Sequence, residues 1–167
     1  MRALNIRWQR LVDATNQTCD RCGATGAAVE RAVEMLKRGL KELDVEVILK
    51  MEALDSATFA QAPLESNRIW IGGVPLEWWL SASSGKSQCC SACGDAECRT
   101  VTVDGKTYEA IPVELIIKAG LLAAARLFQP ESSAGCCETK ENPETIPGCA
   151  LPSSNVDAGE QMNRKGG

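Results

Sequence analysis

The sequence contains no histidine among its 167 residues. Catalytic centres that depend on an imidazole, such as a Ser-His-Asp triad or a Cys-His pair, therefore cannot be built within one copy of the chain. Metal sites with mixed Cys and His ligands are excluded for the same reason. Any metal ion that this chain holds alone must be bound mainly by sulfur.

The sequence also lacks a strongly basic segment and a long apolar one. Its formal net charge is −4 and it has no run of Lys and Arg, so there is no electrostatic basis for binding nucleic acid. No stretch of about 20 uncharged apolar residues could span a membrane. Residues 1–10 alternate polar and apolar side chains, unlike the apolar segment of a secretory signal. We therefore predict a cytoplasmic protein that binds neither nucleic acid nor membrane.

Cysteine, in contrast, is abundant. The nine cysteines fall into three groups, which are a CxxC motif, a dense central segment and a C-terminal group: Cys19 and Cys22; Cys89, Cys90, Cys93 and Cys98; Cys136, Cys137 and Cys149. An odd number argues against a fully paired disulfide framework, and thiols stay reduced in the cytoplasm. Chemistry at thiolates, with a metal or by redox exchange, is the expected activity.

The first half of the chain has the pattern of an α/β domain. Alternating side chains over residues 4–8 predict a half-buried strand. An apolar stripe at helical spacing predicts a helix over 25–43, and a second strand follows at 45–51. The CxxC motif lies in the loop between the first strand and the helix. Strand, helix and strand in this order predict a βαβ unit with parallel strands.

The predicted fold has a central mixed sheet, followed in the second half by a Cys-rich loop and a C-terminal hairpin and helix. The expected elements are a strand over 67–75 with a Gly-Gly turn, a short helix over 76–80, a hairpin over 99–111 that turns at Asp104-Gly105, and an apolar, core-facing helix over 112–128. Residues 54–65 show no clear pattern. We predict one domain over 1–128, with a Cys-rich loop at 84–99, and a disordered tail over 129–167 whose composition is polar.

The CxxC motif directly precedes the predicted helix. A helix N-terminus carries partial positive charge and unpaired N–H groups that stabilise a thiolate, and Arg21 between the cysteines could add to this. One hypothesis is that Cys19 and Cys22 form a catalytic redox dithiol, and the alternative is that they form half of a structural zinc site. The position after a strand and before a helix favours the dithiol.

The second group has the spacing of metal ligands. Cys90-x2-Cys93-x4-Cys98 is compatible with tetrahedral thiolate ligation, and Cys89 or Cys22 could supply a fourth sulfur. Thiolates select Zn(II), Cu(I), Hg(II), As(III) or an iron–sulfur cluster. A structural zinc is the plainer interpretation. However, adjacent cysteines fit one tetrahedral ion poorly and suit larger or three-coordinate ions.

The third group lies in the predicted tail. Cys136 and Cys137 either have no role or form a mobile thiol arm that exchanges metal or disulfide with the other groups.

Four motifs occur together in this chain: Ile6-Arg-Trp-Gln-Arg-Leu11, Thr18-Cys-Asp-Arg-Cys-Gly23, Cys89-Cys90-x2-Cys93-Gly94 and Cys98-Arg-Thr100. Together they resemble a family of small, Cys-rich prokaryotic proteins that is catalogued as a domain of unknown function. The likeness extends over about residues 3–127. It implies a thioredoxin-like fold and no established activity.

The βαβ start also resembles thioredoxins in general, which implies that Cys19 is the attacking thiol and Cys22 the resolving one. Thioredoxins place a cis-proline just before their third strand, facing the dithiol, whereas residues 64–69 here contain no proline. This departure argues against ordinary disulfide reductase activity. The Cys-Cys pairs are similar in style to those of arsenic metallochaperones, which are also thioredoxin-like.

These observations lead to two main hypotheses. The first is a thioredoxin-like protein that binds or transfers a soft metal or metalloid ion through its thiolates, with zinc as the expected ion if the site is structural. The ligands expected from the sequence are Cys89, Cys90, Cys93, Cys98, Cys136 and Cys137. The second is a dithiol–disulfide oxidoreductase that uses Cys19 and Cys22 with a redox partner protein, the segment 89–98 being a structural zinc site or a second redox relay. A scaffold protein with a structural zinc is a third possibility.

Overall fold

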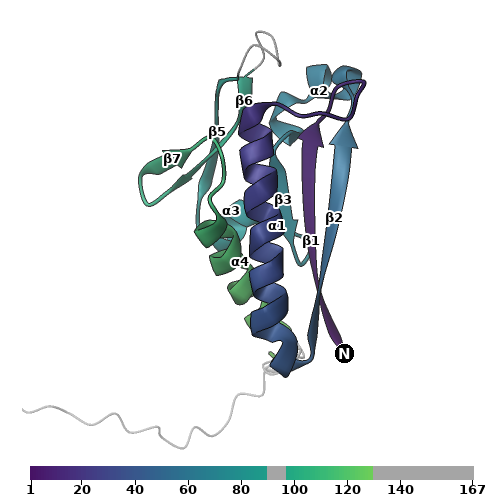
Figure 1. Cartoon of the computed structure of the whole chain (residues 1–167). Helices are drawn as coiled ribbons and strands as arrows, with labels where there is room; N and C mark the ends of the chain where they lie inside the picture. The colour runs from purple at the N-terminus through teal and green to yellow at the C-terminus, as the bar shows by residue number, and fades with distance from the viewer. Residues whose placement is uncertain (90–96, 130–167) are drawn as a thin grey trace, which may run out of the picture. The chain divides into compact units, whose positions relative to one another are not determined.

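The computed structural model describes residues 1–89 and 97–129 (Figure 1). The elements in chain order are β1 (Arg2–Leu11), α1 (Asp20–Leu40), η1 (Lys41–Leu43), β2 (Val45–Leu54), α2 (Ser56–Gln61), η2 (Pro63–Glu65), β3 (Arg68–Ile71), β4 (Val74–Pro75), α3 (Leu76–Trp79), β5 (Ser83–Gln88), β6 (Glu97–Val103), β7 (Lys106–Tyr108) and α4 (Val113–Arg126). The elements η1 and η2 are single 3₁₀ turns. The chain is therefore a mixed α/β protein, as predicted.

The strands that begin the chain form a four-stranded sheet, sheet A, with the order β2-β1-β3-β4. Strand β1 pairs with β2 in parallel, from Arg2 opposite Val45 to Leu11 opposite Leu54. Strand β3 is antiparallel to β1, and β4 is antiparallel to β3. Helix α1 supplies the crossover between β1 and β2, so the predicted βαβ unit and the mixed sheet are confirmed.

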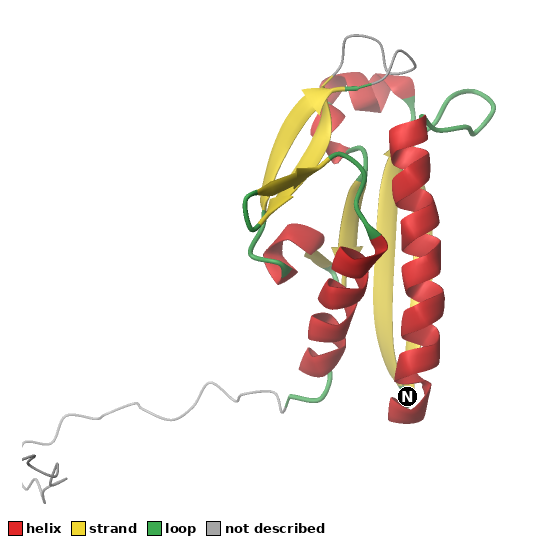
Figure 2. Ribbon diagram, turned by 60° about the vertical axis from the view of Figure 1, so that its left-hand side comes forward, coloured by secondary structure: helices red, strands yellow, loops and turns green. Residues whose placement is uncertain are grey.

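The core lies between sheet A and the two long helices, which cover the same face of the sheet (Figure 2). Leu4, Ile6 and Trp8 alternate along β1 and are buried on this face. Opposite them lies the apolar stripe of α1, whose buried members are Val29, Val33, Leu36 and Leu40. Full burial of one such side chain stabilises the fold by about 1.5–3 kcal/mol. This layer fixes the position of the CxxC motif.

Helix α1 begins five residues before the position predicted from its apolar stripe. Cys19 is the N-cap residue, with extended backbone (φ −68°, ψ 160°), and Asp20 is the first helical residue. The CxxC motif is therefore not in a loop, because Cys22 belongs to the first turn of the helix. The segment has no apolar periodicity, but an acidic residue in the first turn is favourable. At the other end the helix tightens into a 3₁₀ turn, which leaves Leu43 51% exposed rather than in the core.

A second sheet, sheet B, has the order β5-β6-β7 and is antiparallel throughout. The predicted hairpin is β6 and β7, and its turn residues Asp104 and Gly105 have φ values of 50° and 78°. Strand β5 was missed, because residues 84–88 are polar and were expected to belong to the Cys-rich loop. This strand forms by pairing with β6, whose Val101 and Val103 are buried in the core.

Two further helices complete the description. The unassigned stretch 54–65 contains α2, which is capped by the Asp55 side chain accepting a hydrogen bond from the Thr58 N–H at 2.7 Å. Helix α4 starts after Pro112 and buries a face rich in small residues, including Gly120, against α1. Its outer face leaves Leu121 and Leu122 exposed, so the prediction of a core-facing helix holds for one side only.

None of the helices within residues 1–89 and 97–129 combines the length and the apolar character needed to cross a membrane.

Candidate functional site

The two cysteines of the CxxC motif have different surroundings at the start of α1. Cys19 is half-buried at the N-cap, and its carbonyl accepts a hydrogen bond from the Gly23 N–H at 2.7 Å. Cys22 is only 1% exposed and belongs to the hydrophobic core. Neither sulfur is in a disulfide. The motif therefore has one accessible thiol, that of Cys19, and one buried thiol, that of Cys22.

Burial raises the pKa of the Cys22 thiol to about 12, and the neighbouring Cys19 charge acts in the same direction. The hydroxyl of Ser66, whose Oγ lies 3.8 Å from Cys22 Sγ, opposes this rise. Ser66 is itself fully buried, just before β3, and its Oγ accepts a hydrogen bond from the Leu11 N–H at 2.9 Å. Cys22 is therefore a neutral thiol at physiological pH.

The sulfur of Cys89 lies 3.8 Å from the sulfur of Cys19. These residues are 70 positions apart, and the sequence placed them in two separate groups. Cys89 directly follows β5 and is half-buried like Cys19. Two thiolates that bind one tetrahedral zinc at about 2.3 Å each are separated by about 3.8 Å. The spacing of the two sulfurs is thus the spacing of neighbouring ligands on one ion.

Sheet B lies beside the start of α1 (Figure 1). Hydrogen bonds from Arg21, in the first turn of this helix, join the two. The Arg21 guanidinium donates hydrogen bonds to the Glu109 carbonyl at 2.9 Å, to the Ser87 hydroxyl at 2.9 Å and to the Arg99 carbonyl at 2.7 Å. The Arg21 side chain is only 9% exposed. Ser87 lies two residues before Cys89, so Arg21 fixes the strand that delivers the third thiol. These contacts give Arg21 a positioning role that its place between two cysteines did not reveal.

A second set of hydrogen bonds joins the same elements. Asn67, which has a positive φ of 57° and is 2% exposed, donates to the Glu109 carbonyl at 3.2 Å. Its side-chain oxygen accepts a hydrogen bond from the Trp8 indole at 3.4 Å. The Thr25 hydroxyl accepts a hydrogen bond from the Ile111 N–H at 3.1 Å. The segment after β7 is therefore tied to α1 and to the turn before β3, and Asn67 in turn ties that turn to β1.

Sheet B is also anchored by a buried ion pair. Arg99 of β6 donates to the Glu77 carboxylate of α3 at 2.8 Å, and the two side chains are 8% and 11% exposed. A further hydrogen bond at 3.1 Å links Arg99 to the Leu64 carbonyl. Cys98, the residue before Arg99, is fully buried and lies opposite Ser87 in the strand register. The site is therefore built on a strand that charged side chains hold in place.

Cys19 is one of the residues that line a small pocket at the surface. The other lining residues are Leu11, Val12, Asp13, Gln17, Thr18 and Ser56. Hydrogen bonds from the backbone of Gln17 and the hydroxyl of Thr15 lower the pKa of the Asp13 carboxyl. One wall of the pocket is therefore anionic at neutral pH.

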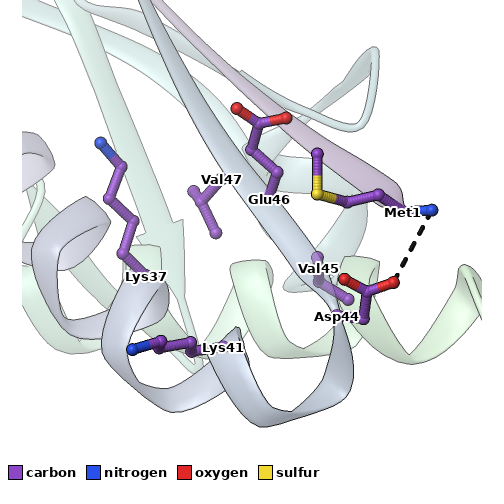
Figure 3. A pocket seen from close by; sticks show the side chains of 7 residues that line it. All are labelled: Met1, Lys37, Lys41, Asp44, Val45, Glu46 and Val47. Atoms are coloured by element: carbon purple, nitrogen blue, oxygen red, sulfur yellow. Dashed lines mark ion pairs between the residues drawn. The ribbon is translucent and has the colours of Figure 1, made fainter.

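Another pocket lies at the far end of α1 (Figure 3). It is lined by charges of both signs, including Lys37, Lys41 and Glu46, and the Met1 amine pairs with Asp44 at 3.7 Å. It contains no cysteine, and we assign it no part in thiol chemistry.

The described residues include four of the eight cysteines that were predicted to act. Cys19, Cys22 and Cys89 converge at the start of α1, and Cys98 is buried in β6. Cys90, Cys93, Cys136 and Cys137 lie outside the described residues. Within residues 1–89 and 97–129, no three Cys, Asp or Glu side chains form a cluster suited to a metal ion.

Ser66 and Asn67 were not identified as parts of this site from the sequence. The sequence pattern predicts a strand that begins at Asn67, whereas β3 begins at Arg68 and Asn67 has a positive φ, which Asn tolerates better than most residues. Their contacts depend on how β1, β3 and the segment after β7 come together. A single sequence does not reveal that arrangement.

Comparisons with known proteins identify the family. No solved structure is significantly similar to this chain. A relative described as an uncharacterized protein of Archaeoglobus fulgidus is 38% identical over 113 residues, which cover 68% of this chain and 82% of the relative. The family described as a domain of unknown function, DUF2703, matches residues 4–120. This match covers more than half of the chain and all the described cysteines, and the chain therefore belongs to the DUF2703 family.

Proposed function

We propose that this protein binds or transfers a soft metal or metalloid ion, and that Cys19 and Cys89 are two of its ligands. The observation that carries the proposal is the 3.8 Å separation between the two sulfurs. That separation fits two thiolates on one ion, and thiolates select soft ions such as Zn(II), Hg(II) or As(III). The proposal joins the CxxC motif and the central cysteine group into one site.

Two sulfurs alone do not make a structural zinc site, which takes four ligands. Cys90 and Cys93 of the central group are the natural source of the others, whereas Cys98 is as fully buried as Cys22. A three-coordinate ion such as As(III) would need only one more sulfur. Cys22 receives no ligand role, because it is 1% exposed and its sulfur lies against the Ser66 hydroxyl.

The accessibility of the two cysteines supports transfer of the ion rather than its permanent storage. Cys19 and Cys89 are both half-buried, and the pocket beside Cys19 opens to the surface. An incoming thiol from a partner protein could therefore reach a bound ion. We place the protein in a reducing compartment such as the cytoplasm, because its cysteines must stay reduced to act as ligands.

A second candidate function is dithiol–disulfide exchange at Cys19 and Cys22. The favouring observation is an accessible thiol at the N-cap of α1 with a buried thiol in the next turn. The parallel β1–β2 pair and the antiparallel β3 also fit a thioredoxin-like fold. Against this candidate, Ser66 and Asn67 lie just before β3, where a thioredoxin has its cis-proline. We therefore rank ion binding first.

The binding experiment uses the full-length protein, purified without oxygen, with its thiols counted and its bound metal measured. As(III) and Zn(II) are then titrated against the wild type and the Cys19→Ser, Cys89→Ser and Cys22→Ser variants. We expect Cys19→Ser and Cys89→Ser each to weaken As(III) binding by about 100-fold, or about 2.7 kcal/mol. Cys22→Ser is the matched control and should keep its affinity within about threefold. Unchanged binding in Cys19→Ser and Cys89→Ser would refute the proposal.

The same variants separate the second candidate. Dithiol exchange requires Cys22, so Cys22→Ser would abolish turnover of a protein disulfide such as insulin by the reduced protein. Ion binding does not require Cys22. Loss of turnover together with unaltered As(III) affinity in Cys19→Ser would favour the oxidoreductase.

A further inference from the structure

We propose that Cys19 and Cys89 form a disulfide with each other under oxidising conditions, and that this cross-link releases the bound ion. The cross-link itself follows from the geometry of the two thiols. Only the release step rests on the proposed function. The cross-link would join the start of α1 to the end of β5 and close a loop of 70 positions.

The two sulfurs are in nonbonded contact. A disulfide bond is about 2.05 Å long, so the sulfurs must approach by about 1.8 Å from their present 3.8 Å separation. The backbone on both sides is already fixed, because Arg21 of the helix donates to Ser87, two residues before Cys89.

The competing pair is Cys19 with Cys22. That pair would close within one turn of α1, as in an ordinary CxxC disulfide. The Cys22 thiol also interacts with Cys19, but it is 1% exposed and makes a second contact, at 3.8 Å, with Ser66 Oγ, whereas Cys89 is half-buried beside Cys19. An accessible thiol exchanges faster than a buried one.

The oxidant in this scheme is a low-molecular-weight disulfide, RSSR. The Cys19 thiolate attacks one sulfur of RSSR, which forms a Cys19–SR mixed disulfide and releases RS⁻. The Cys89 thiolate then attacks Cys19 Sγ, which forms the Cys19–Cys89 bond and releases the second RS⁻. Two thiolates are oxidised and one external disulfide is reduced to two thiolates. A dithiol reductant reverses the sequence.

Oxidation of this pair would remove two ligands at once. A sulfur in a disulfide carries no negative charge, and a thiolate is the form that binds a metal. The site would therefore hold its ion only in the reduced state. This is a redox control built from one residue of the CxxC motif and one residue of the central cysteine group.

Tryptic peptides of this chain can locate the cross-link. Trypsin cuts after Arg21, so Cys19 lies in peptide 11–21 and Cys22 lies alone in peptide 22–31. Cys89 lies in peptide 87–99 together with three other cysteines, which fragmentation in the mass spectrometer resolves. The full-length protein is treated with glutathione disulfide, its remaining thiols are alkylated, and the digest is analysed without reduction.

We expect peptide 11–21 linked to peptide 87–99 through Cys89. The link should disappear in Cys89→Ser and persist in Cys90→Ser, which is the matched control on the neighbouring residue. A dominant link between peptides 11–21 and 22–31 would overturn the inference. So would the absence of any link to peptide 11–21, or a link that survives in Cys89→Ser.

The release step is tested by titrating As(III) into the reduced and the oxidised full-length protein. We expect at least about tenfold weaker binding after oxidation, and recovery after reduction with a phosphine. Equal binding by the cross-linked protein would overturn the release step. If the cross-link forms but the reduced protein binds no ion, the proposed function fails and the cross-link stands. If the reduced protein binds and no cross-link forms, this inference fails and the proposed function stands.

Discussion

Sheet A and sheet B are held in this protein by different kinds of interaction. Sheet A is fixed by apolar burial, since its Leu4, Ile6 and Ile71 are at most 1% exposed beneath α1 and α4. Sheet B buries part of β6, but its place beside α1 depends on the guanidinium groups of Arg21 and Arg99. Cys19 and Cys22 are attached to the apolar region, and Cys89 is attached to the polar one. Stability and site geometry can therefore be perturbed separately.

The largest effect is expected from breaking the buried ion pair that anchors sheet B. Arg99→Ala leaves the Glu77 carboxylate buried without its partner, at a cost of about 3–5 kcal/mol in the free energy of unfolding. Urea denaturation measures this loss. The double variant Glu77→Leu with Arg99→Met removes both charges and should be destabilised less than Arg99→Ala. An Arg99→Ala protein as stable as the wild type would show that polar contacts do not hold sheet B.

The apolar side of the comparison is tested at Gly26 of α1. A β-carbon at this position would overlap the Trp8 ring, so Gly26→Ala should destabilise the protein by about 1–3 kcal/mol through overpacking. Gly39, on the same helix, has open space around its α-carbon and provides the matched control. Gly39→Ala should stabilise the helix by about 0.5–1 kcal/mol. Equal effects at the two glycines would contradict a close α1–sheet A contact.

Substitution of Arg21 is expected to change the free energy of unfolding less and to weaken ion binding as well. Arg21→Lys keeps the charge but loses the planar fork that contacts Ser87, Glu109 and Arg99. We expect a loss of about 1–2 kcal/mol in unfolding free energy and about tenfold weaker As(III) binding, or about 1.4 kcal/mol. Arg31→Lys, at an exposed position of α1, is the control and should change neither. Unaltered ion affinity in Arg21→Lys would mean that Arg21 does not position Cys89.

The smallest effect is expected in the free energy of unfolding at alkaline pH, to which the buried thiol of Cys22 contributes. The folded-state pKa of about 12 exceeds the ordinary value of 9.0, so the native state holds this proton more tightly than the unfolded chain. The contribution is complete below pH 9 and is lost as the pH rises towards 12. Near pH 10 this loss amounts to about 1 kcal/mol. Comparing Cys22→Ala with the wild type across this range isolates the thiol. If the free energy of unfolding changed with pH in the same way in both proteins, the burial of Cys22 would be contradicted.

The sequence predicted well what depends on local pattern. Alternation along β1, the stripe of α1 and the Asp104-Gly105 turn each identified an element, because burial and backbone preference act over a few residues. It failed for β5, whose polar residues become a strand only through pairing with β6. It also failed for the extent of the first helical turn, since residues 20–24 carry no apolar periodicity.

The candidate site was predicted in its parts and not in its assembly. Cys19, Cys22 and Cys89 were all named from spacing, and yet the contact between Cys19 and Cys89 joins residues of different groups. That contact follows from the Arg21 hydrogen bonds, which hold the end of sheet B beside the start of α1. The contribution of Ser66 likewise requires the tertiary fold, because nothing in its own sequence neighbourhood marks it as a neighbour of Cys22.

The central claim is that Cys19 and Cys89 bind the same ion, and a double-mutant cycle in As(III) affinity tests it most directly. The wild type, Cys19→Ser, Cys89→Ser and the double variant are titrated as reduced full-length proteins. If both sulfurs hold one ion, either single substitution destroys the site, and the double variant binds no more weakly than a single one, with a loss of about 100-fold. Losses that add in free energy would mean that Cys19 and Cys89 act independently, and would contradict the account.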